Sequence, residues 1–379
     1  KEIYSKMEFT LPSNWYTCST IFNIEIEQIF SREWICAGRC DEIPNPGDHE
    51  VLRVSGESVL IVRNQDNQLR AFYNVCRHRG SALCLSPEES NITLLPNARV
   101  TEKYIKCPYH AWSYDLDGNL INAPHMNNVT EFNKDDFPLH TIGCLEWGGF
   151  FFLNLTSSER TRFDQSIADV NRKYSRYPLN KMVVGKEIKY SVNANWKVLC
   201  ENYNECYHCG PVHPELCNLV PAFKIKGGSD LDWEKGVPHR EGADTFSFTG
   251  VSNLTVFEGL SDEELTKHKG DIIYPNLFLS FAKDHVAAFI LKPIDYNHTE
   301  VKCLFLFDQT ETNKPEDYFR DVVDFWDLIN RQDWEICSRV QQGLKSRAHE
   351  RGLLSPMEDW NLDIRHYVSE RIGKFVDVD

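Results

Sequence analysis

The chain has 379 residues, of which 41% are hydrophobic and 26% charged, and a formal net charge of −15. This length suits about two domains, and the acidic balance argues against a nucleic-acid partner, which requires a basic surface. No apolar run approaches the roughly 18 residues needed to cross a bilayer, so we expect a soluble protein with no membrane span.

The cysteines indicate a reducing compartment. There are 13 of them, an odd number, and the opening residues KEIYSKMEF contain no apolar core of a secretory signal. We therefore expect reduced thiols, some of them metal ligands, rather than a disulfide framework. The expected location is the cytoplasm, or an organelle such as the chloroplast if a targeting peptide was removed.

The first part of the chain alternates short β-rich runs with turn residues. Residues 49–75 contain HEVLRV, VLIVR and LRAFYNV, and an Asp-Gly pair at 117–118 lies between two further strand-like pieces. The run GGFFFLNL at 148–155 predicts another strand. These signals predict a small all-β domain that ends near residue 155.

The pattern changes after about residue 156, where we place the domain boundary. A strand is predicted at 187–192, a helix at about 195–208, and strands between 272 and 308. A single long amphipathic helix is predicted from Pro315 to about Lys345. The second domain is therefore expected to be α+β, an antiparallel sheet with helices packed on it.

Two loops of the first domain offer four metal ligands. Cys76 and His78 form a Cys-x-His pair, and Cys107 and His110 form a Cys-x-x-His pair. A structural zinc site is the simpler interpretation of four such ligands, but a zinc motif usually has a pair of cysteines followed by a pair of histidines. Alternation of Cys and His in each loop favours a [2Fe–2S] cluster in which two thiolates hold one iron and two imidazoles the other.

A second set of ligands lies in the second domain. His208 and His213 flank Gly210-Pro211, which is expected to break the helix and turn the second imidazole back toward the first. Two imidazoles need one carboxylate to form the Fe²⁺ site of a non-haem oxygenase. We choose Asp333 for that role, with Glu335 and Asp327 as competitors that periodicity alone cannot separate.

These residues resemble the motifs of the catalytic α-subunits of Rieske non-haem iron oxygenases. The cluster motif matches at 76–80 and 107–112, and the catalytic motif at 195–213, NWKVLCENYNECYHCGPVH. The 28 residues between the two cluster loops, 79–106, form a longer gap than is usual in that family. We interpret the stretch LCLSPEESNITLLPNARVTEKY within it as a polar surface insertion, which costs little.

The resemblance implies an N-terminal segment over residues 1–40 that packs on the catalytic domain, a Rieske [2Fe–2S] domain over 41–155, and a helix-grip catalytic domain over 156–379. It also implies a homotrimer in which electrons from a separate NAD(P)H-dependent reductase or ferredoxin cross between subunits. Glu205 is implied as the carboxylate that bridges a cluster histidine of one subunit and an iron-ligand histidine of the next. Asn202, Tyr203 and Glu201 are candidates to support the iron ligands.

Glutamate at position 205 resembles the quaternary-ammonium branch of that family, whose members act on choline, glycine betaine or carnitine. The expected activity is therefore an O₂-dependent monooxygenation or N-demethylation of a small quaternary amine. The alternatives are a Rieske ring-hydroxylating dioxygenase and, from a different class, a Rieske electron-transfer protein without oxygenase activity.

Overall fold

The structure, a computed structural model, describes residues 7–86, 89, 97–226, 228–229 and 231–376. The chain divides into two compact units. One is continuous, Phe30–Gln165, and the other joins Lys1–Ile29 to Ser166–Asp379.

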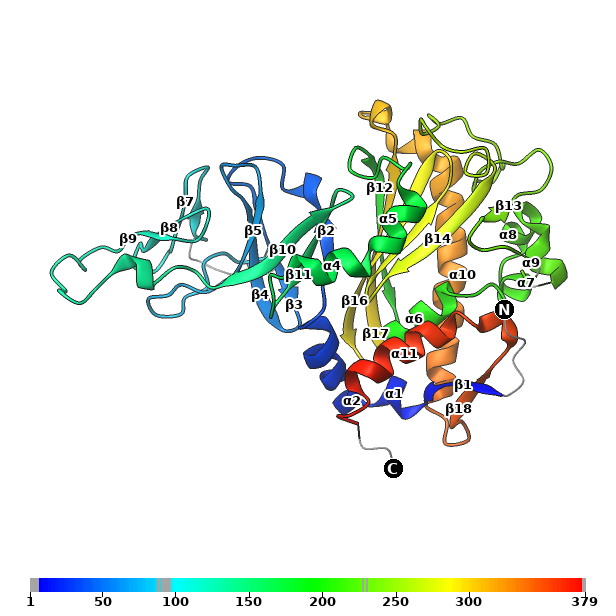
Figure 1. Cartoon of the computed structure of the whole chain (residues 1–379), viewed down its shortest axis with the longest axis horizontal. Coiled ribbons are helices and arrows are strands. Elements are labelled where there is room, and N and C mark those ends of the chain that lie inside the picture. Colours follow the sequence, from blue (N-terminus) through cyan, green and yellow to red (C-terminus); the bar gives the residue numbers. More distant parts are fainter. Residues whose placement is uncertain (1–6, 87–88, 90–96, 227, 230, 377–379) are drawn as a thin grey trace. The chain divides into compact units, whose positions relative to one another are not determined.

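The Phe30–Gln165 unit is built from two antiparallel sheets (Figure 1). The six-stranded sheet has the order β2 (Ile35–Arg39), β11 (Phe150–Asn154), β10 (Thr141–Trp147), β5 (Leu69–Tyr73), β4 (Glu57–Arg63), β3 (His49–Val54). The four-stranded sheet has the order β6 (Arg99–Val100), β7 (Tyr104–Lys106), β8 (Ser113–Asp115), β9 (Leu120–Asn122). A buried apolar cluster that includes Leu60, Phe72 and Tyr114 draws on both sheets and surrounds the two cysteines of the first predicted site.

The predicted strands of this unit are confirmed at 49–75, at 148–155 and on both sides of the Asp-Gly turn. Strand β10 was not predicted, because TIGCLEW mixes glycine and glutamate with its apolar residues. The unit extends about ten residues beyond each end of 41–155, since β2 pairs with β11 and Phe163 of α4 (Arg160–Ser166) packs on Phe152. Much of the predicted insertion, 87–88 and 90–96, lies outside the described residues.

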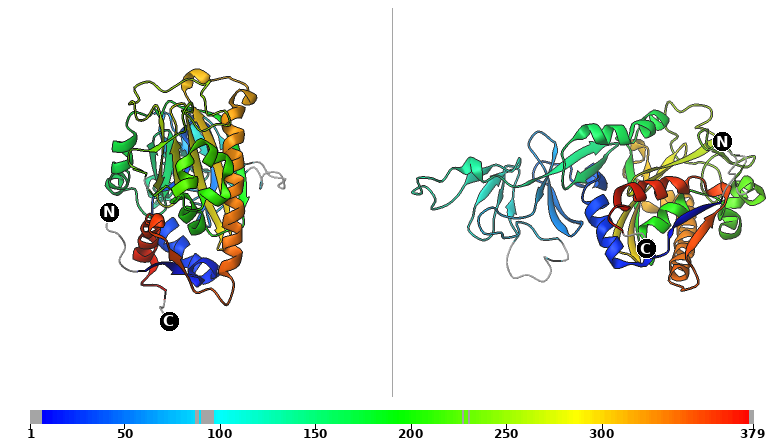
Figure 2. Two further views of the ribbon diagram at one scale, coloured as in Figure 1. Left: turned by 90° about the vertical axis from the view of Figure 1, so that its right-hand side faces the viewer. Right: turned by 60° about the horizontal axis from the view of Figure 1, so that its bottom comes forward.

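The other unit has a six-stranded antiparallel sheet with a long helix against one face (Figures 1 and 2). The sheet order is β12 (Val183–Val192), β17 (His298–Phe307), β16 (His285–Asp295), β15 (Leu277–Phe281), β14 (Lys267–Ile273), β13 (Val237–Pro238). A short sheet pairs β1 (Glu8–Pro12) with β18 (Arg351–Leu354). The helices are α1 (Asn14–Thr17), α2 (Ser19–Glu25), α5 (Ala168–Tyr174), α6 (Trp196–Tyr203), α7 (Cys209–Val212), α8 (Pro214–Leu219), α9 (Pro221–Lys226), α10 (Arg320–Leu344) and α11 (Asn361–Ile372).

The α+β class and the long helix near 315–345 are confirmed. The helix α10 begins at Arg320, after a single 3₁₀ turn at Glu316–Phe319. The strands predicted between 272 and 308 are confirmed, and within the run at 272–281 a turn at Tyr274-Pro275-Asn276 separates β14 from β15.

The start of α6 is fixed by a buried polar cluster. Asn195 caps the helix by accepting the backbone N–H of Lys197 at 3.1 Å. The Lys197 ammonium, fully buried, forms an ion pair with Glu25 of α2, which is also fully buried and accepts the Trp196 indole N–H at 2.8 Å. The residues Asn195-Trp196-Lys197 therefore anchor the helix to the N-terminal segment rather than take part in chemistry.

Lys197→Met is expected to destabilise this unit by about 3–5 kcal/mol, because it leaves the Glu25 carboxylate buried without its cation. The matched control is Lys186→Met, which removes an exposed pair with Glu316 and should cost less than about 1 kcal/mol. Denaturant unfolding followed by circular dichroism measures both. Equal losses in the two variants would contradict the anchoring role.

No helix in the described part of the chain is long and apolar enough to span a membrane. Likewise, no disulfide bond joins the cysteines of the described residues.

Candidate metal centres

The four predicted ligands of the first site come together on two loops of the Phe30–Gln165 unit. Cys76 and Cys107 are buried, each 3% exposed, and their thiols are hydrogen-bonded to one another. The rings of His78 and His110 are exposed and lie with their centroids 4.7 Å apart. The site therefore has a buried sulfur side and an exposed imidazole side.

Neighbouring aromatic residues hold these loops in place. The Tyr114 hydroxyl lies 3.3 Å from the Cys76 sulfur and accepts the Arg77 N–H at 3.0 Å. Trp112 stacks on His78 with centroids 4.8 Å apart and accepts the Cys107 N–H on its carbonyl at 2.8 Å. Both loops are therefore fixed by contacts that leave the sulfur and imidazole nitrogen atoms available.

The chemistry of these donors fits a [2Fe–2S] cluster. The hydrogen bond between the thiols, with burial, raises the pKa of Cys76, whereas the same bond lowers the pKa of Cys107 to about 5. One thiolate is thus stabilised even without a metal, and metal binding displaces the remaining proton. Two buried thiolates suit the inner iron, and two exposed imidazoles suit the outer one.

Cys76→Ser is expected to bleach the red-brown protein, because a serine hydroxyl does not replace the thiolate that holds the cluster. The matched control is Cys84→Ser, another thiol that is 1% exposed in the same core and is not among the predicted ligands. The visible spectrum and the iron content of the soluble fraction report the result. An unchanged spectrum in Cys76→Ser would refute this cluster.

The second site brings together residues that are far apart in sequence. His208 precedes α7, His213 follows it, and Asp333 lies on α10. One carboxylate oxygen of Asp333, Oδ1, lies 3.2 Å from Nε2 of His208 and 2.9 Å from Nε2 of His213. Two imidazoles and one carboxylate therefore converge through atoms that could bind one metal ion.

Each imidazole is oriented by a second hydrogen bond. Nδ1 of His208 donates to Oε1 of Glu205 at 2.6 Å, and Nδ1 of His213 donates to Oε1 of Gln332 at 2.8 Å. Gln332 is held in turn by Glu215, whose carboxylate accepts its amide N–H at 2.9 Å. Since Nδ1 of each ring carries the hydrogen that orients it, both Nε2 atoms are available to bind a metal ion.

The electrostatics also fit a divalent cation. Burial opposes charge on both groups, but the hydrogen bonds to Asp333 and Glu205 raise the pKa of His208 to about 11. Despite burial, the two imidazoles lower the pKa of Asp333 to about 2. Without a metal, protons therefore occupy the place that a cation would take, and metal binding releases them.

The competing carboxylates lie elsewhere. Glu335 is exposed and pairs with Arg339, and Asp327 accepts hydrogen bonds from Tyr190 at 2.7 Å and Arg331 at 2.8 Å. The neighbouring thiol of Cys209 is closer to the site, 3.9 Å from Nε2 of His208. His208, Cys209 and His213 have potential ligand atoms within 4.8 Å of one another.

Two details of the predicted local structure are wrong. The helix α6 ends at Tyr203 rather than near 208, because the Glu205 carboxylate accepts the N–H groups of Tyr207 and His208 and closes a turn. Gly210-Pro211 does not break a helix but lies within the one-turn α7, where proline is tolerated near the N-terminus. The turn at 204–208 is therefore what brings the two imidazoles together.

The three supporting candidates have different environments. Asn202 lies near Nε2 of His208, at 3.4 Å, and the Tyr203 hydroxyl bonds to Ser280 at 2.6 Å. Glu201 faces away from the site: Tyr16 donates to its carboxylate, and burial raises its pKa to about 7. Gln332, which orients His213, was not predicted, although it directly precedes Asp333.

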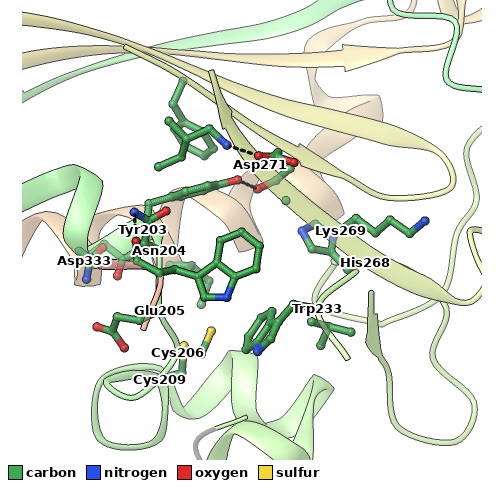
Figure 3. A pocket seen from close by; sticks show the side chains of 18 of the residues that line it. Tyr203, Asn204, Glu205, Cys206, Cys209, Trp233, His268, Lys269, Asp271 and Asp333 are labelled. Atoms are coloured by element: carbon green, nitrogen blue, oxygen red, sulfur yellow. Dashed lines mark hydrogen bonds between the residues drawn. The ribbon is translucent and has the colours of Figure 1, made fainter. Parts of the chain in front are cut away.

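A cavity of about 220 Å³ adjoins the second site (Figure 3). Its lining includes all three converging residues of that site. It also includes several aromatic side chains from the 223–246 region, the sheet, α10 and the residue before α11: Phe223, Trp233, Phe246, Phe289, Trp326, Trp334 and Trp360. Figure 3 shows Trp233 and His268 across the cavity from Asp333. A ligand in the cavity would thus lie between aromatic faces and the metal ligands.

The fold and the two sites together define a Rieske-type non-haem iron oxygenase. A family model for the Rieske [2Fe–2S] domain matches residues 33–133, and a model for the catalytic domain of ring-hydroxylating α-subunits matches residues 179–373. The chain belongs to the family of ring-hydroxylating oxygenase α-subunits. The two predicted cofactors, a [2Fe–2S] cluster and a mononuclear non-haem Fe²⁺, are thereby confirmed.

Within this family, the chain is similar to several oxygenase subunits whose names state a substrate. The chain is 30% identical to the carnitine monooxygenase oxygenase subunit of Escherichia coli strain K12, over 90% of this chain and 86% of that protein. It is 29% identical to the glycine betaine monooxygenase oxygenase subunit of Pseudomonas aeruginosa strain PAO1, over 96% and 89% of the two chains. The crystal structure of the quaternary ammonium Rieske monooxygenase CntA with L-carnitine superposes with a TM-score of 0.71 at 25% identity, covering 96% of each chain.

Proposed function

We propose that this chain is the oxygenase subunit of a monooxygenase that uses O₂ to oxidise a small quaternary ammonium compound resembling choline, glycine betaine or carnitine. The observation that supports this most directly is the aromatic cavity beside His208, His213 and Asp333. The names of the relatives support the same substrate class.

The cavity suits a small cation. Its volume of about 220 Å³ lies below the roughly 300–1,000 Å³ typical of sites for drug-sized ligands. Tryptophan and phenylalanine faces attract a quaternary ammonium ion through their negative π-faces and offer it no hydrogen bond, which it does not need. The acidic side chain of Asp363 also lines the cavity and favours a positive ligand.

In this proposal Cys76, His78, Cys107 and His110 hold the cluster, and His208, His213 and Asp333 hold the mononuclear iron. The iron supplies a site at which O₂ is bound and activated. The protein contributes the rest: Glu205 and Gln332 orient the two imidazoles, and the apolar walls exclude water from the reacting methyl or methylene group.

Electrons come from a separate NAD(P)H-dependent reductase or a ferredoxin. We propose a homotrimer in which the cluster of one subunit serves the mononuclear iron of the next, with Glu205 as the bridge. Its carboxylate already accepts the Nδ1–H of His208 at 2.6 Å, which is the iron-side half of such a bridge.

Oxygen uptake coupled to product formation, driven by a surrogate reductase, tests the proposal. Choline, glycine betaine and carnitine are compared with 3,3-dimethylbutan-1-ol, the uncharged carbon isostere of choline, and with naphthalene. We expect coupled turnover of at least one quaternary amine and none of the isostere, because the aromatic faces select positive charge.

Two results would contradict the proposal. Formation of a cis-diol from naphthalene without turnover of any quaternary amine would favour a ring-hydroxylating dioxygenase. A chain with about two irons and no oxygen uptake with any substrate would favour a Rieske electron carrier.

A further inference from the structure

The cavity wall formed by β14 contains a buried histidine, His268. His268 is 7% exposed, lines the cavity, and its Nδ1 is buried without a hydrogen-bond partner among the described residues. Its ring stacks on Phe246 with centroids 3.8 Å apart and an interplanar angle of 5°, and lies 5.7 Å from the Trp326 ring. The imidazole is therefore held rigidly beside the space where a ligand would lie.

This imidazole is uncharged. Burial, with the nearby rings of His239 and His285, holds the pKa of His268 well below its usual value. His285 has no ring nitrogen available to a ligand, because its Nδ1 bonds to Asp284 at 2.7 Å and its Nε2 accepts the Trp326 indole N–H at 2.9 Å. A neutral imidazole has one N–H donor and one acceptor, so His268 offers hydrogen bonding without charge.

The cations that line the cavity are already paired. Lys173 bonds to Asp169 at 2.7 Å and to Asp271 at 3.2 Å, and Lys269 lies 3.7 Å from Glu264. Figure 3 shows the Lys269 side chain extending away from Asp333. No arginine lines the cavity in the part of the chain that the structure describes. A ligand carboxylate would thus find no unpaired lysine or arginine to neutralise it there.

We infer that the cavity selects a quaternary ammonium compound whose other end is a hydroxyl group rather than a carboxylate, with His268 as the hydrogen-bond partner of that hydroxyl. The inference rests on the proposed function. A hydroxyl both donates and accepts, so it pairs with either neutral tautomer of His268. A carboxylate only accepts, and burying it without an unpaired cation is costly. His268 is a specificity-determining residue in this account.

Calorimetric titration of the holoenzyme with four probes tests this inference. Choline has the cation and the hydroxyl, ethyltrimethylammonium has hydrogen in place of the hydroxyl, glycine betaine has a carboxylate, and tetramethylammonium has the cation alone. We expect choline to bind about tenfold more tightly than ethyltrimethylammonium and than glycine betaine, the effect of one hydrogen bond in a buried site.

The variant His268→Phe keeps a flat ring on Phe246 but removes both nitrogen atoms, and should abolish the advantage of choline over ethyltrimethylammonium. The matched control is His239→Phe. The His239 ring lies 5.2 Å from the ring of the same Phe246, but His239 does not line the cavity. The advantage of choline should persist in this control.

The outcomes distinguish failure of this inference from failure of the proposed function. Tighter binding of glycine betaine than of choline, or an advantage of choline that survives in His268→Phe, overturns the inference and leaves the proposed function standing. Failure of all four probes to bind the wild-type holoenzyme, together with no coupled turnover of choline, glycine betaine or carnitine, overturns the proposed function itself.

Discussion

Asp333→Ala is expected to remove the mononuclear iron and to lower kcat by about three orders of magnitude or more, while the red-brown cluster remains. The reason is geometric: Asp333 is the carboxylate whose oxygen lies 3.2 Å and 2.9 Å from the two imidazole Nε2 atoms. The iron content measured by metal analysis should fall from about three irons per chain to about two. The same result is expected for His208→Ala and His213→Ala.

The same helix supplies the matched control for this prediction. Glu335 lies two residues further along α10, is exposed, and pairs only with Arg339 in the described contacts. Glu335→Ala should retain full iron content and turnover. Iron loss in Glu335→Ala with normal iron in Asp333→Ala would reverse the assignment.

Glu205→Gln is expected to slow single-turnover electron transfer from the reduced cluster to the mononuclear iron by about 10–100-fold, with both metal centres occupied. The amide oxygen can still accept the Nδ1–H of His208, but the amide group no longer provides the negative charge that holds two imidazole N–H groups at once. Rapid mixing of the reduced protein with substrate and O₂, followed at the cluster absorbance, measures this rate.

Glu205→Ala is a less discriminating variant because it also removes three local hydrogen bonds. The carboxylate accepts from Nδ1 of His208 at 2.6 Å and from the backbone N–H groups of Tyr207 and His208. Iron occupancy must therefore be measured beside the rate, and Glu205→Asp should retain part of the transfer. Normal transfer in fully occupied Glu205→Gln would exclude the bridging role.

The cluster loops and the histidine pair could be predicted because their ligands are close in sequence and their spacing is set by local backbone geometry. The meeting of His213 with Asp333 spans 120 residues, and only the packing of α10 on the sheet and α6 determines which of its carboxylates turns inward. For that reason helical periodicity alone could not decide which of Asp333, Glu335 and Asp327 is the third iron ligand.

The cavity could not be predicted because it is a product of tertiary structure. Phe246, His268 and Trp326 come from a loop, a strand and a helix, and nothing in the sequence around each of them distinguishes it from an ordinary core residue. Gln332 and Glu215 were missed for the same reason, since their hydrogen bond joins residues 117 positions apart. The turn at Glu205 was missed because a side chain, not a glycine or proline, ends the helix.

The discontinuous unit has a consequence for biosynthesis. Strand β1 pairs with β18, and Arg365 of α11 donates to the carbonyl of Phe9 at 2.7 Å, so β1 waits during translation for partners that are made more than 300 residues later. The Phe30–Gln165 unit contains all four proposed ligands of the cluster and can fold while the rest of the chain is still being translated. Cluster assembly can therefore precede iron insertion, because Asp333, the proposed third iron ligand, is synthesised 120 residues after His213.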